Sequence, residues 1–382
     1  MKNQANLKYF LPVMLSFYVM GFVDVVGVAT GFLKQDFELS NSMAQLLPFG
    51  VFIWFLLASI PTGVFQDRKG TRITVNIGML ITGIGVLIPF IYYSLATAII
   101  GFAVLGIGNT ILQVSANPLL LSISPENSKA ANLSLSQFIK AIASMLGPII
   151  AASLAIYTGN WKLIFPIYAT ISFLAALWLS SVKIEEPKSV KPPATLKSIF
   201  SLLKNPFTLI TVIGIFFMVG FDVTMNTSIA LFLKNRFDLS IETASFGISI
   251  YFVSLMIGRF LGAILLRKIN NNLFMTVSTV ITLLGLAGLI MSSDLMLTRI
   301  MIFVTGFGFS NLFPLMFAII VSKKPEYANE LSGLIILAVS GGAIVPPIAG
   351  ILTDLVGFSA PLFVLLFCTL YVAFATWYVN KK

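Results

Sequence analysis

One short polar stretch reads Gly63-Val64-Phe65-Gln66-Asp67-Arg68-Lys69-Gly70-Thr71-Arg72. It separates two apolar runs, at 45–65 and 73–93, and each is long enough to cross a bilayer as a helix, which takes about 20 residues. The charged side chains of the stretch cannot lie in the hydrocarbon, because a charge at the centre of a spanning helix costs about 2.5–3.5 kcal/mol. The stretch therefore predicts a tight turn at a membrane surface between two spanning helices.

The composition extends this prediction to the whole chain. Of 382 residues, 58% are hydrophobic and 10% are charged, whereas soluble domains are about 45–50% apolar and about 25% charged. This mixture excludes a soluble protein. The chain has no His and one Cys, which excludes an intramolecular disulfide, a thiolate metal cage and a histidine acid or base. We therefore expect an all-α membrane protein that holds no metal and no cofactor.

Apolar runs of spanning length recur along the sequence. The run at 10–32 shows no small-residue cleavage pattern, so we expect it to remain as a span. We predict twelve transmembrane helices, with cores at 10–32, 45–65, 73–93, 96–121, 132–156, 161–182, 207–233, 244–266, 273–292, 297–321, 331–353 and 360–379. Trp161 and Trp377 lie near span ends, where we expect them to anchor the chain at the membrane interface.

Basic residues predict the orientation. Of the 24 Lys and Arg residues, two lie inside spans, five lie in loops on one side, and the remaining seventeen lie on the side of both termini. Because Lys and Arg mark cytoplasmic loops, we expect both termini to be cytoplasmic. This bias also accounts for the net charge of +10 without an acidic partner. The five residues of the outer loops are Lys34, Lys162, Lys234, Arg236 and Arg299.

The sequence contains an internal repeat. A shift of 200 residues places Phe32-Leu33-Lys34 on Phe232-Leu233-Lys234, and Gly106 and Gly108 on Gly306 and Gly308. We predict two pseudo-symmetric six-helix bundles, 1–182 and 206–382, joined by a polar cytoplasmic linker at 183–205. Because six is even, both bundles enter the membrane from the same side, and a cavity with a substrate site is expected where they meet.

The turn at 63–72 resembles the signature loop of the major facilitator superfamily, Gly-x-x-x-Asp-Arg-x-Gly-Arg-Arg, with Thr71 in place of one Arg. The resemblance implies the major facilitator fold, a secondary active transporter rather than an enzyme, and a cytoplasmic gate. The residues that carry the gate motif are Gly63, Asp67, Arg68, Gly70 and Arg72. The alternative is a turn that only anchors the topology.

A second resemblance concerns sugar carriers. Gln113-Val114-Ser115-Ala116-Asn117-Pro118 resembles the Glu-Thr-Ala-Ala-Asn-Pro run of the fucose:proton symporter family. The segments Val219–Val223, Gly258–Phe260 and Gly341–Pro347 are similar to that family as well. This implies a multi-pass sugar symporter of a bacterial inner membrane.

The chain departs from that family at its coupling residues. Gln113 replaces the family's span-four Glu, and Val28 replaces its span-one Asp. The nearest acid, Asp24, lies one helical turn earlier and therefore on roughly the same face. The resemblance thus supports sugar transport better than proton coupling, and the coupling ion, H⁺ or Na⁺, stays open.

Four ionisable groups lie inside spans: Asp24, Lys140, Asp222 and Arg259. Their summed cost, about 10 kcal/mol, is too large to be incidental, so they should face the cavity or one another. We expect Asp24, Lys140 and Asp222 to take part in ion coupling and Arg259 to supply a charge to the cavity. One hypothesis is a Lys140–Asp24 ion pair that breaks and reforms during transport. The alternative is a permanent structural pair.

Polar side chains in four spans are candidates for sugar binding, because amides and carboxylates can grip pairs of hydroxyl groups. Amides in a helix bundle can instead hold helices together through hydrogen bonds, and this alternative stays open for each of them. The predicted substrate-binding residues are Asn109, Gln113, Asn117, Gln137, Lys140, Asp222, Asn226 and Asn311.

These features predict a carrier that takes up a monosaccharide or related polyol with a cation by alternating access. Its partners are then a small sugar and the lipid bilayer; we expect a monomer that binds no nucleic acid. The first alternative is proton-coupled efflux of a small amphipathic compound, whose pocket should be more apolar. A membrane-embedded enzyme or a receptor is a further alternative, but the spans lack the clustered catalytic groups that an enzyme needs.

Overall fold

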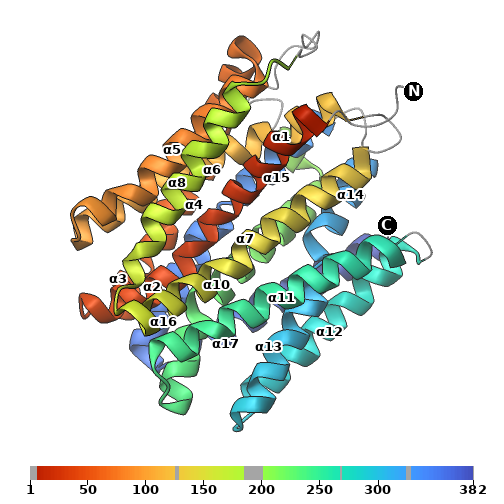
Figure 1. Cartoon of the computed structure of the whole chain (residues 1–382). Helices are drawn as coiled ribbons and strands as arrows, with labels where there is room; N and C mark the ends of the chain where they lie inside the picture. Colours follow the sequence, from red (N-terminus) through yellow and green to blue (C-terminus); the bar gives the residue numbers. More distant parts are fainter. Residues whose placement is uncertain (1–6, 125–128, 185–200, 267–268, 324–327, 382) are drawn as a thin grey trace. The chain divides into compact units, whose positions relative to one another are not determined.

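The computed structural model describes residues 7–124, 129–184, 201–266, 269–323 and 328–381. All regular structure in these ranges is helical (Figure 1). All twelve predicted spans are confirmed: twelve helical segments are long and apolar enough to cross a membrane, and their ends lie at most four residues from the predicted cores. Most of the predicted linker, 185–200, lies outside the described residues.

Polar caps begin several of the helices. Ser94 and Thr97 form a reciprocal capping box at the start of α6, and Asn205, followed by Pro206, caps α10. The 3₁₀ turns are Gly21–Asp24, Trp161–Leu163 and Leu202–Lys204. The α-helices are α1 (Leu7–Met20), α2 (Val25–Asp36), α3 (Asn41–Ala44), α4 (Leu46–Lys69), α5 (Thr71–Ile91), α6 (Leu95–Ile123), α7 (Lys129–Thr158), α8 (Ile164–Ser180), α10 (Pro206–Phe237), α11 (Ile241–Leu265), α12 (Asn271–Met291), α13 (Leu295–Phe309), α14 (Leu312–Lys323), α15 (Ala328–Ala338), α16 (Gly341–Val356) and α17 (Ala360–Lys381).

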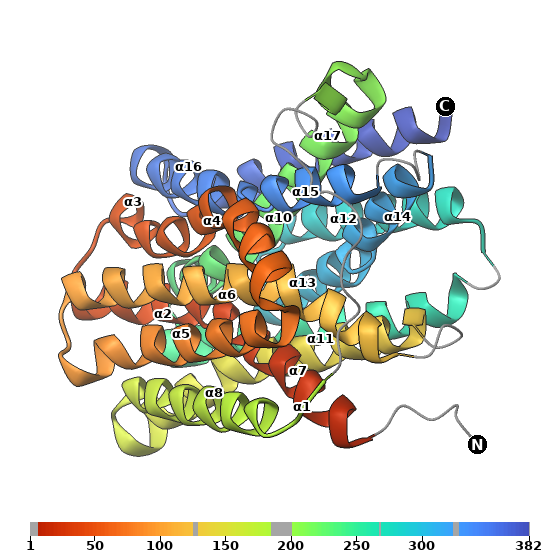
Figure 2. The same cartoon turned by 90° about the horizontal axis from the view of Figure 1, so that it is seen from above.

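Packing divides the chain into two compact units. The first comprises Met1–Val25 and Ile53–Pro193, and the second comprises Val26–Phe52 and Ala194–Lys382. In the first unit α5 lies between α6 and α8, as Figure 2 shows, and α1 packs against α6, α7 and α8. In the second unit α10 is central, because α11, α14, α15, α16 and α17 all pack against it.

The same small-residue contact holds one helix pair together in each unit. Between α5 and α6, a Cβ atom on Gly108 would lie 2.5 Å from the backbone nitrogen of Thr82. Between α12 and α13, a Cβ atom on Gly308 would lie 2.5 Å from the backbone nitrogen of Thr282. Only glycine allows helix backbones to approach so closely. The two contacts are related by the same 200-residue shift as the sequence repeat.

The segment Val26–Phe52 continues span one and begins span two, yet it packs in the second unit. Its short helix α3 lies on α16. Gly27 lies against α10, where a Cβ atom would come within 1.9 Å of Oδ1 of Asn226. The unit is therefore built from both halves of the repeat.

Spans one, ten and eleven are interrupted inside their apolar runs. The interruptions fall at Gly21–Asp24, Ser310–Asn311 and Val339–Ser340. Each break frees backbone groups from the helical hydrogen-bond pattern, and in a bilayer such groups need partners within the protein. Irregular helix segments of this kind occur frequently at functional sites.

The two tryptophans that we expected at the membrane interface differ in how exposed their side chains are. Trp377 is 56% exposed, as expected of an anchor. Trp161 is only 5% exposed, with its ring edge-on to Phe165 and Tyr93, so the prediction for this residue was wrong. The 3₁₀ turn that starts span six directs the indole into the bundle.

Candidate functional site

In the first unit, the polar centre is the break in span one. Asp24 ends the 3₁₀ turn, and a Cβ atom on Gly21, at its start, would lie 2.6 Å from the carbonyl oxygen of Lys140. This close approach brings the turn onto α7. There, the Ser144 hydroxyl lies 2.5 Å from Oδ2 of Asp24. The break therefore positions a carboxylate against a hydroxyl inside the membrane span.

The Ser144 hydroxyl has two possible acceptors. Its oxygen lies 2.5 Å from Oδ2 of Asp24 and 3.1 Å from the carbonyl oxygen of Lys140. A hydroxyl has one proton and two lone pairs. It can donate a hydrogen bond to an ionised Asp24. Alternatively, it can accept one from a protonated Asp24 while it donates to the backbone carbonyl oxygen of Lys140. The Ser144 hydroxyl can therefore pair with Asp24 in either protonation state.

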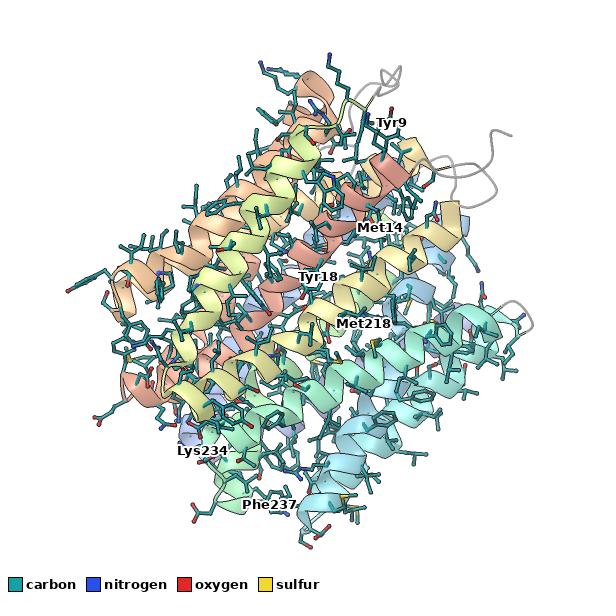
Figure 3. All side chains as sticks on the ribbon, in the orientation of Figure 1. Tyr9, Met14, Tyr18, Met218, Lys234 and Phe237 are labelled. Atoms are coloured by element: carbon teal, nitrogen blue, oxygen red, sulfur yellow. The ribbon has the colours of Figure 1, made fainter. Side chains whose placement is uncertain are left out.

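Three aromatic rings pack together at the break in span one. Phe22 stacks on Tyr168 with ring centroids 3.8 Å apart, and Tyr18 meets Phe22 edge-on at 5.4 Å. Tyr168 is buried, whereas Tyr18 is partly exposed. Figure 3 shows Tyr18 following Met14 along α1. Tyr18 is thus an accessible ring on the helix that leads to Asp24.

The amides of span four differ in their contacts. Asn109 is fully buried, and its amide donates to the carbonyl oxygen of Met20 at 2.7 Å, while Gln113 donates to Oδ1 of Asn109 at 3.0 Å. This chain of bonds favours the interhelical role for Asn109. Asn117 differs, since its buried Oδ1 has no hydrogen-bond partner among the described residues. Gln137, on α7, is partly exposed.

In the second unit, the central contact joins α10 to α11. The fully buried Tyr251 donates a hydrogen bond of 2.7 Å to Oδ1 of Asp222, which is partly exposed. The neighbouring ring of Phe221 stacks on Phe309 with centroids 4.6 Å apart. The tyrosine therefore orients a carboxylate that keeps access to solvent.

The other candidates of the second unit pack between helices. Asn311 donates to the carbonyl oxygen of Gly258 at 2.7 Å, and Nε of Arg259 donates to the carbonyl oxygen of Ser310 at 3.3 Å. These bonds satisfy groups at the break in span ten, so they favour a structural role for both side chains. Asn226 is 2% exposed and lies against Gly27.

The gate motif forms the turn between α4 and α5. Gly70 precedes α5 with φ of +91°, a conformation that side chains with a Cβ rarely adopt. Arg68 is exposed, and the Asp67 side chain lies outside the described part of the structure. Gly63 has open space around it. Among the described side chains of the motif, Arg72 makes hydrogen bonds to the end of another helix: its guanidinium donates to the carbonyl oxygens of Leu179, Ser180 and Val182.

These three carbonyls lie at the C-terminal end of α8, where helix carbonyl groups lack partners. Arg72 therefore caps α8 and ties span three to span six within the first unit.

Within the described ranges, no cluster of three or more His, Cys, Asp or Glu side chains could hold a metal ion.

Two residues of these centres, Ser144 and Tyr251, are not among the residues predicted from the sequence. Ser144 follows Lys140 by four positions, so it could have been recognised as lying on the same face of the helix. Tyr251 carries no comparable signal, because its partner Asp222 lies 29 residues away on another helix.

Comparison with known proteins covers nearly the whole chain. The sequence profile of the Major Facilitator Superfamily matches residues 13–345. A glucose/galactose transporter of Brucella abortus is 24% identical over 389 residues, with 97% of this chain and 94% of the relative covered.

Two solved structures share the fold. The fucose:proton symporter of E. coli gives a TM-score of 0.71 at 15% identity and covers 98% of both chains. A bacterial homologue of the human lysosomal transporter Spinster gives a TM-score of 0.75 at 15% identity, with 99% of this chain and 97% of the other covered. The predicted fold is therefore confirmed. The chain belongs to the major facilitator superfamily, whose members are multi-pass membrane transporters and not enzymes.

Proposed function

We propose that this protein takes up a monosaccharide or a related polyol together with a cation, by alternating access. The observation that carries the proposal is the match of 97% of the chain to a relative named as a glucose/galactose transporter. The excess of Lys and Arg in loops on the side of the termini supports cytoplasmic termini in a bacterial inner membrane. The bundles 1–182 and 206–382 are then the halves that move, and the carrier acts as a monomer.

We propose H⁺ as the coupling ion and Asp24 as its binding group. The Ser144 hydroxyl supports this assignment, since it can pair with Asp24 in either protonation state. A Na⁺ site would need several oxygen ligands around the carboxylate.

We propose that the sugar contacts polar groups with free hydrogen-bonding capacity. In the first unit these are the unsatisfied Oδ1 of Asn117, with Gln113 and Gln137. In the second unit Asp222, oriented by Tyr251, is the main candidate. Tyr18 supplies an aromatic face for the C–H surface of the sugar. Asn109, Asn226 and Asn311 then support these groups through helix packing.

Counterflow in proteoliposomes tests the proposal. Vesicles are preloaded with unlabelled sugar, and entry of labelled D-galactose, D-glucose or L-fucose is followed with no ion gradient. We expect preloading to accelerate entry of at least one of these sugars, while L-glucose, the mirror-image control, shows no acceleration. Absence of counterflow for every sugar, together with efflux of amphipathic dyes, would replace uptake with the efflux alternative.

A further inference from the structure

A carboxylate near the end of α16 binds the start of span two. Oδ1 of Asp354 accepts hydrogen bonds from the backbone nitrogen and the side-chain amide of Asn41, at 2.9 and 2.7 Å. Oδ2 accepts from the backbone nitrogen and the hydroxyl of Ser42, at 2.8 and 2.5 Å. All four bonds join residues more than 300 positions apart in the sequence. One side chain thus holds two distant segments together.

Glycines bring the two segments into direct contact beside this carboxylate. A Cβ atom on Gly350, one turn before Asp354, would lie 2.8 Å from both the carbonyl oxygen of Asn41 and Cγ of Gln45. Near the start of α16, a Cβ atom on Gly342 would lie 2.9 Å from the ring of Phe52. Two glycines on one helix thus let span two pack along α16 from Asn41 to Phe52.

The other end of the segment Val26–Phe52 is held by α10 and α11. Gly31 lies against Ile241, where a Cβ atom would be 2.9 Å from its side chain. Lys234, near the end of α10 in Figure 3, donates to Oε1 of Gln35 at 3.2 Å. The segment is therefore attached to three helices of the second unit.

The attachment is built to be reversible. Asp354 is exposed and Asn41 and Ser42 are partly exposed, so water can replace the four hydrogen bonds when the segments separate, and exposed polar contacts contribute little net free energy. Behind them, Gly350 and Gly342 lie on the α16 side of the contact, against Gln45 and the ring of Phe52. The segment also begins two residues after Asp24, at the end of the break in span one.

We propose that Asp354 is a latch of the transport cycle: its bonds to Asn41 and Ser42 close the outer end of spans one and two onto span eleven, and their release opens that end. This inference rests on the proposed function, because a latch has a role only in a carrier that alternates. Asp354 does not touch the substrate in this account. It is a positioning residue that sets how often the outer end opens.

A small pocket directly behind the latch provides a reporter. Its lining includes Asn41, Gln45, Ser228, Gly350 and Thr353. Ser228 is 5% exposed, so a thiol placed there should react only when the outer end opens. The chain has a single native cysteine, the buried Cys368, which Cys368→Ala removes. Ser228→Cys in that background gives one reactive site.

The experiment measures the rate at which a membrane-impermeant thiol reagent modifies Ser228→Cys, with and without Asp354→Asn. Asparagine offers one acceptor oxygen and a donor NH₂, so about half of the four bonds are lost. We expect the labelling rate to rise about tenfold, which corresponds to a loss of ~1.4 kcal/mol in closure. Asp294→Asn is the matched control, because Asp294 is an exposed carboxylate that caps only its own helix, α13. An unchanged rate with Asp354→Asn would overturn the latch.

A second variant guards against an indirect effect. Gly350→Ala leaves Asp354 intact but introduces the methyl group that the contact with Asn41 cannot accommodate. It should raise the labelling rate as well, and a rate equal to that of the parent would contradict the proposed closed contact. The reagent is applied to intact cells and to inverted vesicles, with Tyr157→Cys, at an 86% exposed position near the end of α7, as the reference for the accessible side. Since no sugar is involved, failure of counterflow would refute the proposed function without affecting this result.

Discussion

The Tyr251 hydroxyl donates a hydrogen bond of 2.7 Å to Oδ1 of Asp222, from a ring that has no exposed surface. Because the ring is held in place by packing, its hydroxyl fixes the orientation of the Asp222 carboxylate, which accepts the hydrogen bond. Asp222 itself remains partly exposed, so its second oxygen can meet a ligand. The pair therefore links helix packing in the second unit to a candidate sugar-binding group.

Tyr251→Phe removes this hydrogen bond and keeps the ring. Because a hydrogen bond to an ionised group contributes about 1.5–3 kcal/mol, we expect the KM of sugar counterflow to rise about tenfold or more. Tyr157→Phe is the control, since Tyr157 is 86% exposed at the end of α7. A loss of thermal stability with an unchanged KM would show that the contact is only structural.

Asp24→Asn removes the group that is proposed to bind the proton. The amide oxygen still accepts the Ser144 hydroxyl, so the local packing should persist. We expect sugar accumulation against a gradient to disappear while counterflow continues at a rate close to that of the parent. Asp294→Asn should leave both activities unchanged. Full accumulation by Asp24→Asn would exclude Asp24 as the coupling group.

Variants of two asparagines in span four should distinguish a structural role from a role in sugar binding. Asn109→Ala loses an interhelical bond, worth about 0.6 kcal/mol on average in membrane proteins, and leaves the Met20 carbonyl without its donor. It should lower thermal stability, and it should raise KM less than Asn117→Ala does, because its effect on the site passes only through the lost Asn109–Gln113 hydrogen bond. Asn117→Ala should raise KM without lowering stability, because its Oδ1 has no hydrogen-bond partner in the described ranges. The reverse pattern would exchange the two roles.

Arg72 should act as a helix cap. Arg72→Ala leaves the carbonyls at the end of α8 without their donor, and a cation at a helix C-terminus contributes about 0.3–1 kcal/mol, up to ~2 kcal/mol when partly buried. We expect a lower unfolding temperature, measured by tryptophan fluorescence in detergent. Arg72→Lys should restore only part of it, since one ammonium group cannot reproduce the guanidinium fork. The exposed Arg68→Ala should have no effect, and equal losses from both variants would argue against the cap.

The sequence alone predicts the spans well, because hydropathy and length determine which segments cross a bilayer. All twelve spans and the superfamily are confirmed. The interruptions within spans were not predicted. The break at Gly21–Asp24 depends on the approach of Gly21 to Lys140, which is a tertiary contact that local composition does not reveal.

The candidate site is less accessible to sequence reasoning for the same reason. Asn109 and Asn117 have the same side chain and lie two turns apart, yet only their surroundings distinguish an interhelical bond from an unsatisfied acceptor. Trp161 lies near a span end but is buried by a local 3₁₀ turn. The partners of Asp222 and Asp354 come from other helices and follow from the fold rather than from spacing.

The most direct test of the account is sugar accumulation in proteoliposomes with the pH gradient and the Na⁺ gradient imposed separately. We predict that an inward H⁺ gradient drives D-galactose or D-glucose above its external concentration and that Asp24→Asn abolishes this accumulation. A Na⁺ gradient alone should drive none. Proton-coupled uptake would be contradicted if the Na⁺ gradient drove accumulation and the pH gradient did not. It would also be contradicted if the sugar only reached its external concentration under either gradient.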